Sequence, residues 1–160
     1  MKKFLVILLG CYIGLILFMP KEQLFFTLQR YLAKKQIFIN AASTQTPLSL
    51  HLRKGTLFYN GMDLASIQHA SIYPYLFFNR LQIHDGELKV GNYIIKTLAA
   101  DYSLLHPWQV MLHGMSASGP LDGTIDLKTH ELKLYIQNPP HIMLQYLRRN
   151  KKGYYFYAKF

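Results

Sequence analysis

From residue 36 onward, apolar and polar side chains alternate along the chain, and this two-residue period constrains the fold more than any other feature. Leu50 and Leu52 are flanked by polar residues, and so are Leu81 and Ile83. Successive side chains of a β-strand point to opposite faces of the sheet, so segments of this kind form strands with one buried face. The pattern predicts a mainly β domain over residues 37–160, folded as an antiparallel, curved sheet or groove.

Glycine and asparagine interrupt the alternating runs where they can adopt a positive φ, which favours tight turns. These positions are Lys54-Gly55, Asn60-Gly61, Asp85-Gly86 and Gly91-Asn92. Because proline lacks the donor that a strand ladder needs, two corners are predicted at Tyr73-Pro74-Tyr75 and Leu105-His106-Pro107-Trp108. Residues 125–136 form the strongest predicted hairpin, and a short helix near Met143 and Leu147 is expected before a last aromatic strand at 154–160.

The chain begins with Lys2 and Lys3, followed by an apolar run from Phe4 to Met19 without a charged residue. A basic start followed by such a run is typical of a signal sequence or a membrane helix. No small residues of a cleavage site close the run, which predicts an uncleaved transmembrane signal anchor over residues 1–20. The run rises by only about 24 Å against a hydrocarbon core of about 30 Å, so both lysines would have to reach toward the headgroups.

Three small residues inside the anchor suggest separate hypotheses. Gly10 and Gly14 have the spacing that lets two membrane helices approach closely, which predicts a helix-packing site, with a merely tolerated glycine pair as the alternative. Cys11 completes a Leu-Leu-Gly-Cys sequence that resembles a lipoprotein box, but apolar residues continue beyond it. As the single cysteine, it also excludes an intrachain disulfide and a cysteine-based metal cluster.

Residues 21–36 predict an amphipathic juxtamembrane helix. Its apolar residues Leu24, Leu28, Tyr31 and Leu32 recur on one face. Such a helix lies either in the lipid headgroups, with Phe25 and Phe26 dipping into the bilayer, or on the following domain. We expect its cations, with the two that precede the anchor, to form a basic membrane surface made of Lys2, Lys3, Lys21, Arg30, Lys34 and Lys35.

The positive charge is concentrated at the two ends of the chain. Of the net +10, residues 1–54 contribute +7, residues 55–136 contribute −2 and residues 137–160 contribute +5. A nucleic-acid-binding module would carry the excess across its folded binding face, so this distribution favours membrane lipids as a partner and argues against nucleic acid. The basic run Arg148, Arg149, Lys151 and Lys152 is either a partner contact or a solvated surface.

No arrangement in the sequence predicts catalysis or a bound cofactor. The seven histidines never fall at the i, i+4 spacing of a helical metal site. The stretch from Gly114 to Gly119 misses the nucleophile-elbow pattern by one position, and no glycine-rich phosphate loop with its lysine occurs. The sequence therefore predicts a non-enzymatic protein with no metal site and no cofactor.

Three segments resemble those of a known family. They are the anchor that ends in Phe18-Met19-Pro20, the segment Gly55-Thr56-Leu57-Phe58-Tyr59-Asn60-Gly61, and Trp108-Gln109-Val110 leading to Gly119-Pro120-Leu121-Asp122-Gly123-Thr124-Ile125-Asp126-Leu127. In them the chain resembles the type II secretion protein N family, bacterial envelope proteins with one inner-membrane helix and a β-rich periplasmic body. The resemblance implies an accessory subunit of a type II secretion-like, pilus or envelope assembly machine. It also implies a single-pass inner-membrane protein whose β domain lies in the periplasm and binds other envelope proteins.

That family is similar to AsmA-like and lipopolysaccharide-bridge proteins, whose curved sheets hold lipid tails. This similarity implies a second function, lipid binding or lipid transfer, in which one sheet face would form an apolar groove with a bound lipid. Its lining residues would be Leu50, Leu81, Ile83, Ile125 and Ile136. The lysines and arginines on the two sides of the anchor favour a cytoplasmic body instead, so a cytoplasm-facing domain is a third hypothesis.

Overall fold

The computed structural model describes residues 2–89, 93–137, 139, 144–145, 147–150 and 153–159 of the chain. Within these residues two helices, α1 (Lys2–Phe18) and α2 (Lys21–Ala33), precede ten strands of one sheet. The strands are β1 (Ile37–Gln45), β2 (Leu50–Tyr59), β3 (Met62–Pro74), β4 (Phe78–Leu88), β5 (Tyr93–Ser103), β6 (Gln109–Ser116), β7 (Gly119–Asp126), β8 (Glu131–Ile136), β9 (Leu147–Asn150) and β10 (Gly153–Lys159).

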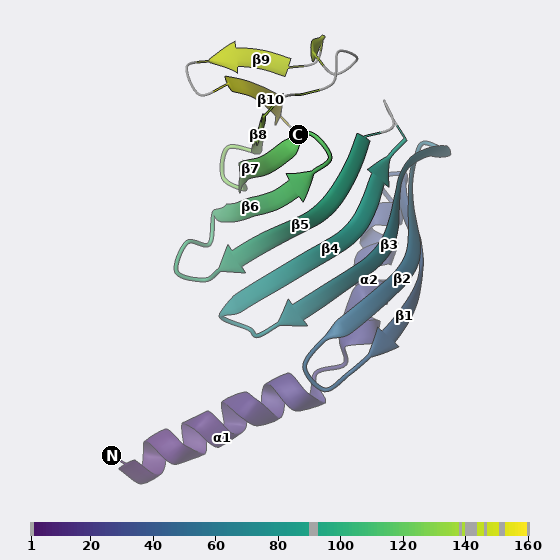
Figure 1. Cartoon of the computed structure of the whole chain (residues 1–160). Coiled ribbons are helices and arrows are strands. Elements are labelled where there is room, and N and C mark those ends of the chain that lie inside the picture. The colour runs from purple at the N-terminus through teal and green to yellow at the C-terminus, as the bar shows by residue number, and fades with distance from the viewer. Residues whose placement is uncertain are drawn as a thin grey trace.

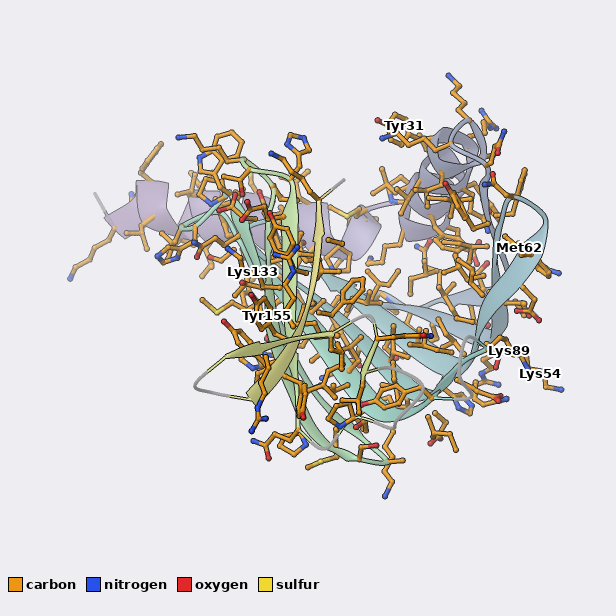
Figure 2. All side chains as sticks on the ribbon, turned by 90° about the horizontal axis from the view of Figure 1, so that it is seen from above. Tyr31, Lys54, Met62, Lys89, Lys133 and Tyr155 are labelled. Carbon is orange, nitrogen blue, oxygen red and sulfur yellow. The ribbon has the colours of Figure 1, made fainter. Side chains whose placement is uncertain are left out.

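Consecutive strands pair antiparallel from β1 to β8, so this part of the sheet is a meander. The order changes at the end, where β10 pairs with β8 and β9 lies outermost. The sheet twists and curves strongly along this order (Figure 1). Seen from above, it follows an open arc, with β1–β3 and α2 on one arm and β6–β7 on the other (Figure 2).

The prediction of a mainly β protein with an antiparallel sheet is confirmed. The predicted hairpin at 125–136 is formed by β7 and β8, and the last aromatic strand is β10. The C-terminal helix predicted near Leu147 is wrong at that residue, because Leu147 begins β9 and pairs with Phe156. Met143 lies outside the described residues.

The two helices are joined at a sharp bend. The chain turns by 62° between α1 and α2, and Pro20, with φ −79° and ψ 77°, lies outside helical geometry just before α2 begins. In the described part of the chain, neither helix by itself has the length and apolar character needed to cross a membrane. The bent pair taken together meets both requirements by length and composition.

The second helix packs on the sheet through a different face from the predicted apolar one. Phe25 is only 5% exposed and lies in a cluster with Leu50, Leu52 and Ala70, so of the two alternatives this residue follows packing on the domain. The Gln29 side-chain amide donates to the Ile39 carbonyl of β1 at 2.7 Å. Tertiary contacts therefore select the Phe25 and Gln29 side of the helix.

The predicted apolar stripe of α2 is left largely uncovered. Leu24 is 52% exposed, Leu28 is 48% exposed and Tyr31 is 58% exposed. Helical spacing puts these three residues on one face of α2. The face that packs on the sheet is the neighbouring one, which carries Phe25 and Gln29. The stripe is therefore free to contact something other than the strands of this chain.

Two of the predicted glycine turns are bends inside strands. The positive φ falls on the residue before each glycine, with 50° at Lys54 in β2 and 54° at Asp85 in β4, and the chain does not reverse at either place. Asn60-Gly61 does form the turn between β2 and β3, whereas Gly91-Asn92 lies outside the described residues.

These bends align across four neighbouring strands. At this level the ladders skip Lys54, Gln68, Asp85 and Lys96 in β2 to β5, and each skipped residue forms a pair of successive exposed residues with one neighbour. The pairs are Arg53-Lys54, Gln68-His69, His84-Asp85 and Lys96-Thr97. Figure 2 shows Lys54 projecting away from the sheet. In each strand the two successive exposed residues shift the alternation by one position, so the same face is buried before and after the bend. β-bulges curve a strand in a similar way.

Candidate functional site

The register of the sheet determines which side chains share a face. Directly paired residues of an antiparallel ladder point to the same side. Two adjacent rows of paired residues run from β2 to β8, and we call the surface they form the apolar face. The first row is Leu50, Ile72, Leu81, Ala100, Leu112, Gly123 and Leu134, and the second is Leu52, Ala70, Ile83, Leu98, Gly114, Leu121 and Ile136.

All five residues predicted to line an apolar groove lie on this face. Four of them stand in the two rows, and Ile125 lies one step along β7, where it pairs with Val110 and Leu132. The residues that sequence reasoning missed are those of β5 and β6, such as Leu98 and Leu112. Alternation is weak there because alanine and glycine interrupt it, and only the continuation of the ladder from β4 identifies them.

The apolar face is covered unevenly. Over β1 to β3 it is covered by Phe25 of α2, and over β7 and β8 Leu121 and Ile136 are 1% and 3% exposed in a second cluster with Tyr93. Between these two clusters, Leu98 and Ala100 are partly exposed. An apolar pocket of about 170 Å³ opens beside the first cluster, with Leu52, Gly55, Ile67 and Ala70 among its walls. The apolar face is therefore partly accessible at Leu98 and Ala100, whereas Leu112 beside them is buried.

We call the other side of the sheet the polar face. On it, polar side chains pair with each other across neighbouring strands. The Arg80 guanidinium donates to both carboxylate oxygens of Asp101 at 2.6 and 3.0 Å, and this pairing raises the pKa of Arg80. His113 Nδ1 lies 2.9 Å from the Asp122 carboxylate on the next pair of strands. Each of these pairs joins directly opposed residues, so they stabilise the sheet as cross-strand contacts.

A third polar group on this face lies near the C-terminal strands. The Lys133 amine and the Tyr157 hydroxyl both donate to the Glu131 carboxylate at 2.9 Å, and these bonds lower the pKa of Glu131. The same bonds raise the pKa of Lys133 and of Tyr157. Over the described residues, no three His, Cys, Asp or Glu side chains are grouped so as to hold a metal ion.

One residue of the predicted basic membrane surface has a different position. Lys21 is only 3% exposed, and its Nζ donates to the carbonyls of Ile16 at 2.9 Å and Pro47 at 2.7 Å, with a longer bond of 3.5 Å to Met19. Burial lowers the pKa of Lys21. An amine at the C-terminal end of a helix satisfies carbonyls that lack a helical partner. Lys21 therefore joins α1, α2 and the β1–β2 turn instead of facing lipid.

The other predicted site residues are at the surface. Lys2, Lys3, Arg30, Lys34 and Lys35 are exposed. Among the described residues, no atom apart from the neighbouring residues and nearby backbone of α1 lies within 4 Å of a Cβ placed on Gly10 or Gly14, so this side of α1 is open to those residues. Arg148 and Arg149 are exposed, with their guanidinium groups 5.2 Å from the Tyr157 ring centroid and 5.7 Å from that of Tyr154. Lys151 and Lys152 lie outside the described residues.

The fold and site define an antiparallel β-meander with one apolar and one polar face. No protein-family model, curated protein sequence or solved structure matches the chain. The resemblance to the type II secretion protein N family rests on the three sequence segments given above.

Proposed function

We propose that this protein is a non-enzymatic, membrane-anchored lipid-binding protein of the AsmA-like or lipopolysaccharide-bridge kind, whose apolar face holds the acyl chains of a lipid. The observation that carries this proposal is the pair of uninterrupted apolar rows across β2 to β8. A sheet of a compact domain covers such a face with a second layer. Here α2 covers only its first strands.

The dimensions of the apolar face fit a lipid tail. From β2 to β8 there are six inter-strand spacings of about 4.8 Å, or about 29 Å in total. One acyl chain spans about half of a hydrocarbon core that is about 30 Å thick. The face is therefore long enough for an extended chain, and its partly exposed middle, around Leu98 and Ala100, supplies apolar contacts without competing polar groups.

The total exposed surface supports an open architecture. The chain exposes 11284 Å², whereas a compact globular protein of 18.6 kDa exposes about 8,200 Å². The excess comes from the projecting α1 and from a sheet that is not closed by a second layer. Both features fit a protein whose apolar surface is completed by lipid.

We place the protein in the bacterial inner membrane as a single-pass protein with its sheet in the periplasm. The support is the charge-free run of α1, whose exposed side chains include Phe4, Leu5 and Leu8 at 71%, 66% and 60%. A reporter that is active only outside the cytoplasm, fused to the C-terminus, tests the orientation. An inactive but well-expressed fusion would show that the body faces the cytoplasm.

A second candidate function is that of an accessory subunit of an envelope assembly machine. The observation that favours it is the outer edge of β1, whose nine residues pair only with β2 among the described strands. An unpaired edge can accept a strand from a partner protein. In contrast, the opposite edge is the four-residue β9, which carries Arg148 and Arg149 and is poorly suited to pairing.

Native mass spectrometry of the full chain, purified in mild detergent, separates the two candidates. Lipid binding predicts one or more copurifying lipid molecules per chain. The matched variants are Ala100→Glu, on the apolar face between Leu81 and Leu112, and Ala99→Glu, on the polar face between Gln82 and His113. We expect Ala100→Glu to lose the lipid and Ala99→Glu to keep it.

The two possible failures have different meanings. Wild-type protein that never carries lipid would overturn lipid binding and favour the accessory subunit. Lipid retained equally by both variants would show that the apolar face is not where it binds. Circular dichroism verifies that both variants keep their strands, and the uncharged Ala100→Gln serves as a second variant if Ala100→Glu does not fold.

A further inference from the structure

The meander brings four turns to the same end of the sheet, namely those between β1 and β2, β3 and β4, β5 and β6, and β7 and β8. Every one of these turns exposes a large apolar side chain. Phe77 is 62% exposed, Leu105 is 87% exposed and Trp108 is 58% exposed. We call this set the apolar turn edge, and it consists of Leu48, Phe77, Leu104, Leu105, Trp108 and Leu127.

The other end of the sheet has a different character. Its described turns are Asn60-Gly61 and Ala117-Ser118, and Lys89 follows β4 there. The large exposed apolar side chains at that end, Phe38, Tyr59, Met62, Ile94 and Met115, belong to strands and not to the described turns. The described turns of the two ends therefore differ, because only those of the apolar turn edge carry large apolar side chains.

The first helix begins its approach to the sheet below the β1–β2 turn, at the end that carries the apolar turn edge (Figure 1). The Tyr12 hydroxyl donates to the Tyr75 carbonyl at 2.7 Å, and the Tyr12 and Phe77 rings are 5.5 Å apart. An open apolar pocket of about 420 Å³ lies between α1 and the β3–β4 turn, with Leu8 and Leu76 among its walls. Lys21 ties the end of α1 to the β1–β2 turn. Two of the four turns, those between β1 and β2 and between β3 and β4, are therefore held next to α1.

The composition of the turns identifies the partner of this surface. Residues 46–49, 75–77, 104–108 and 127–130 contain no Asp or Glu, and Lys128 is their one Lys or Arg. Tryptophan, tyrosine and leucine next to cationic groups are the residues that proteins place at the level of lipid headgroups. The four turns follow one end of the sheet, and the first two of them lie beside α1, so they form an extended edge instead of a single recessed pocket, which suits a planar partner.

We propose that the apolar turn edge inserts into the interfacial region of a phospholipid bilayer beside α1, so that the sheet stands on the membrane by this end. This inference rests on the proposed function in one respect, that α1 is the membrane anchor. It adds that the apolar face begins at the bilayer surface, since Val110 and Ile125 lie on that face at the strand ends next to the turns. A lipid tail could then pass from the bilayer to the sheet without crossing water.

The single tryptophan of the chain makes this placement measurable without a substitution, because Trp108 belongs to the apolar turn edge. The full chain is reconstituted in vesicles of phosphatidylcholine and phosphatidylglycerol, with bromine on the acyl chains as a quencher. We expect the emission of Trp108 to shift to the blue on reconstitution and to lose intensity to bromine. Because interfacial groups lie about 5–10 Å deep, bromine near the carbonyl end should quench more than bromine near the methyl end.

Two tryptophan variants in a Trp108→Phe background provide the controls. Leu8→Trp reports the anchor itself, and Met62→Trp reports the opposite end of the sheet, where residue 62 is about as exposed as Trp108. We expect bromine to quench Leu8→Trp strongly, and Met62→Trp to remain open to the aqueous quencher acrylamide. Circular dichroism shows whether each variant retains its strands.

Each outcome distinguishes the inference from the function on which it rests. Quenching at Leu8→Trp without quenching of Trp108 would overturn the inference and leave the anchor standing. No quenching at Leu8→Trp would overturn the anchor and with it the inference. Equal quenching of Trp108 and Met62→Trp would mean that the sheet lies flat on the bilayer, which also contradicts the inference. Selective quenching of Trp108 over Met62→Trp supports it.

Discussion

Replacing Gly123 by alanine tests whether close strand approach shapes the apolar face. A Cβ added there would stand 2.6 Å from the Lys133 carbonyl oxygen and 3.0 Å from Leu134 Cδ1. Backbone cannot yield as a flexible side chain can, so β7 or β8 must move. Gly86 offers a matched control inside β4, because a Cβ at that position would meet only Ile83 Cγ2 at 3.6 Å and atoms of Ile95 at 3.8 Å.

The magnitude follows from two opposing effects. Overpacking of this kind destabilises the folded protein by about 1–3 kcal/mol. The lower flexibility of alanine in the unfolded chain offsets about 0.5–1 kcal/mol of this loss. We therefore expect Gly123→Ala to destabilise the protein by about 1–2 kcal/mol and Gly86→Ala to be neutral or slightly stabilising. For a domain of this size, 1 kcal/mol corresponds to about 2–4 °C in Tm, so Gly123→Ala should lower the Tm by about 2–8 °C.

The assay is thermal unfolding of the full chain in detergent, followed by circular dichroism in the strand region. A Tm of Gly123→Ala that matches or exceeds that of Gly86→Ala would refute the reasoning, because it would mean that the close contact with Lys133 is absent. Gly114→Ala, whose Cβ would meet the Thr97 carbonyl oxygen, should resemble Gly123→Ala.

Two further predictions concern charged groups. Lys21→Met should destabilise the protein by about 3 kcal/mol in the same melts, because it leaves the carbonyls of Ile16 and Pro47 without their donor, whereas Lys34→Met at an exposed position should change little. Glu131→Gln should be less stable than wild type at neutral pH. Because the folded-state pKa of Glu131 is lowered, its contribution is present above the ordinary carboxyl range and is lost as the pH falls through the lowered pKa. Melts at decreasing pH should show the two proteins converging, and a gap of constant size would contradict this assignment.

Much of the sheet could be predicted from alternation, because the two-residue period directly reports a face that is buried. Alternation therefore predicts one surface that carries Leu50, Leu81, Ile83, Ile125 and Ile136, and all five lie on the apolar face. Positive φ was expected at Gly55 and Gly86, but it falls on the preceding residues, Lys54 and Asp85. Local preference could not show that the neighbouring strands bend at the same level.

The residues of the candidate site that sequence reasoning misplaced are those whose role depends on distant neighbours. Lys21 has the local signature of a membrane-facing cation, and only the approach of the β1–β2 turn buries it against Pro47. Phe25 lies outside the most regular apolar stripe of α2, yet the sheet selects it. Helical periodicity ranks the faces of a helix by hydrophobicity, whereas packing selects the face whose side chains fit the opposing surface.

By itself, the sequence determined the class of the protein: an apolar, charge-free first segment, an amphipathic connection and an antiparallel sheet with one apolar side. These properties follow from residue order over a few positions, since strand and helix periods are local. Tertiary structure alone decided that the apolar turns gather at one end beside α1, and that two apolar rows run unbroken from β2 to β8. Both depend on the register between strands, which is set by hydrogen bonds between residues far apart in the chain and has no counterpart in any single segment.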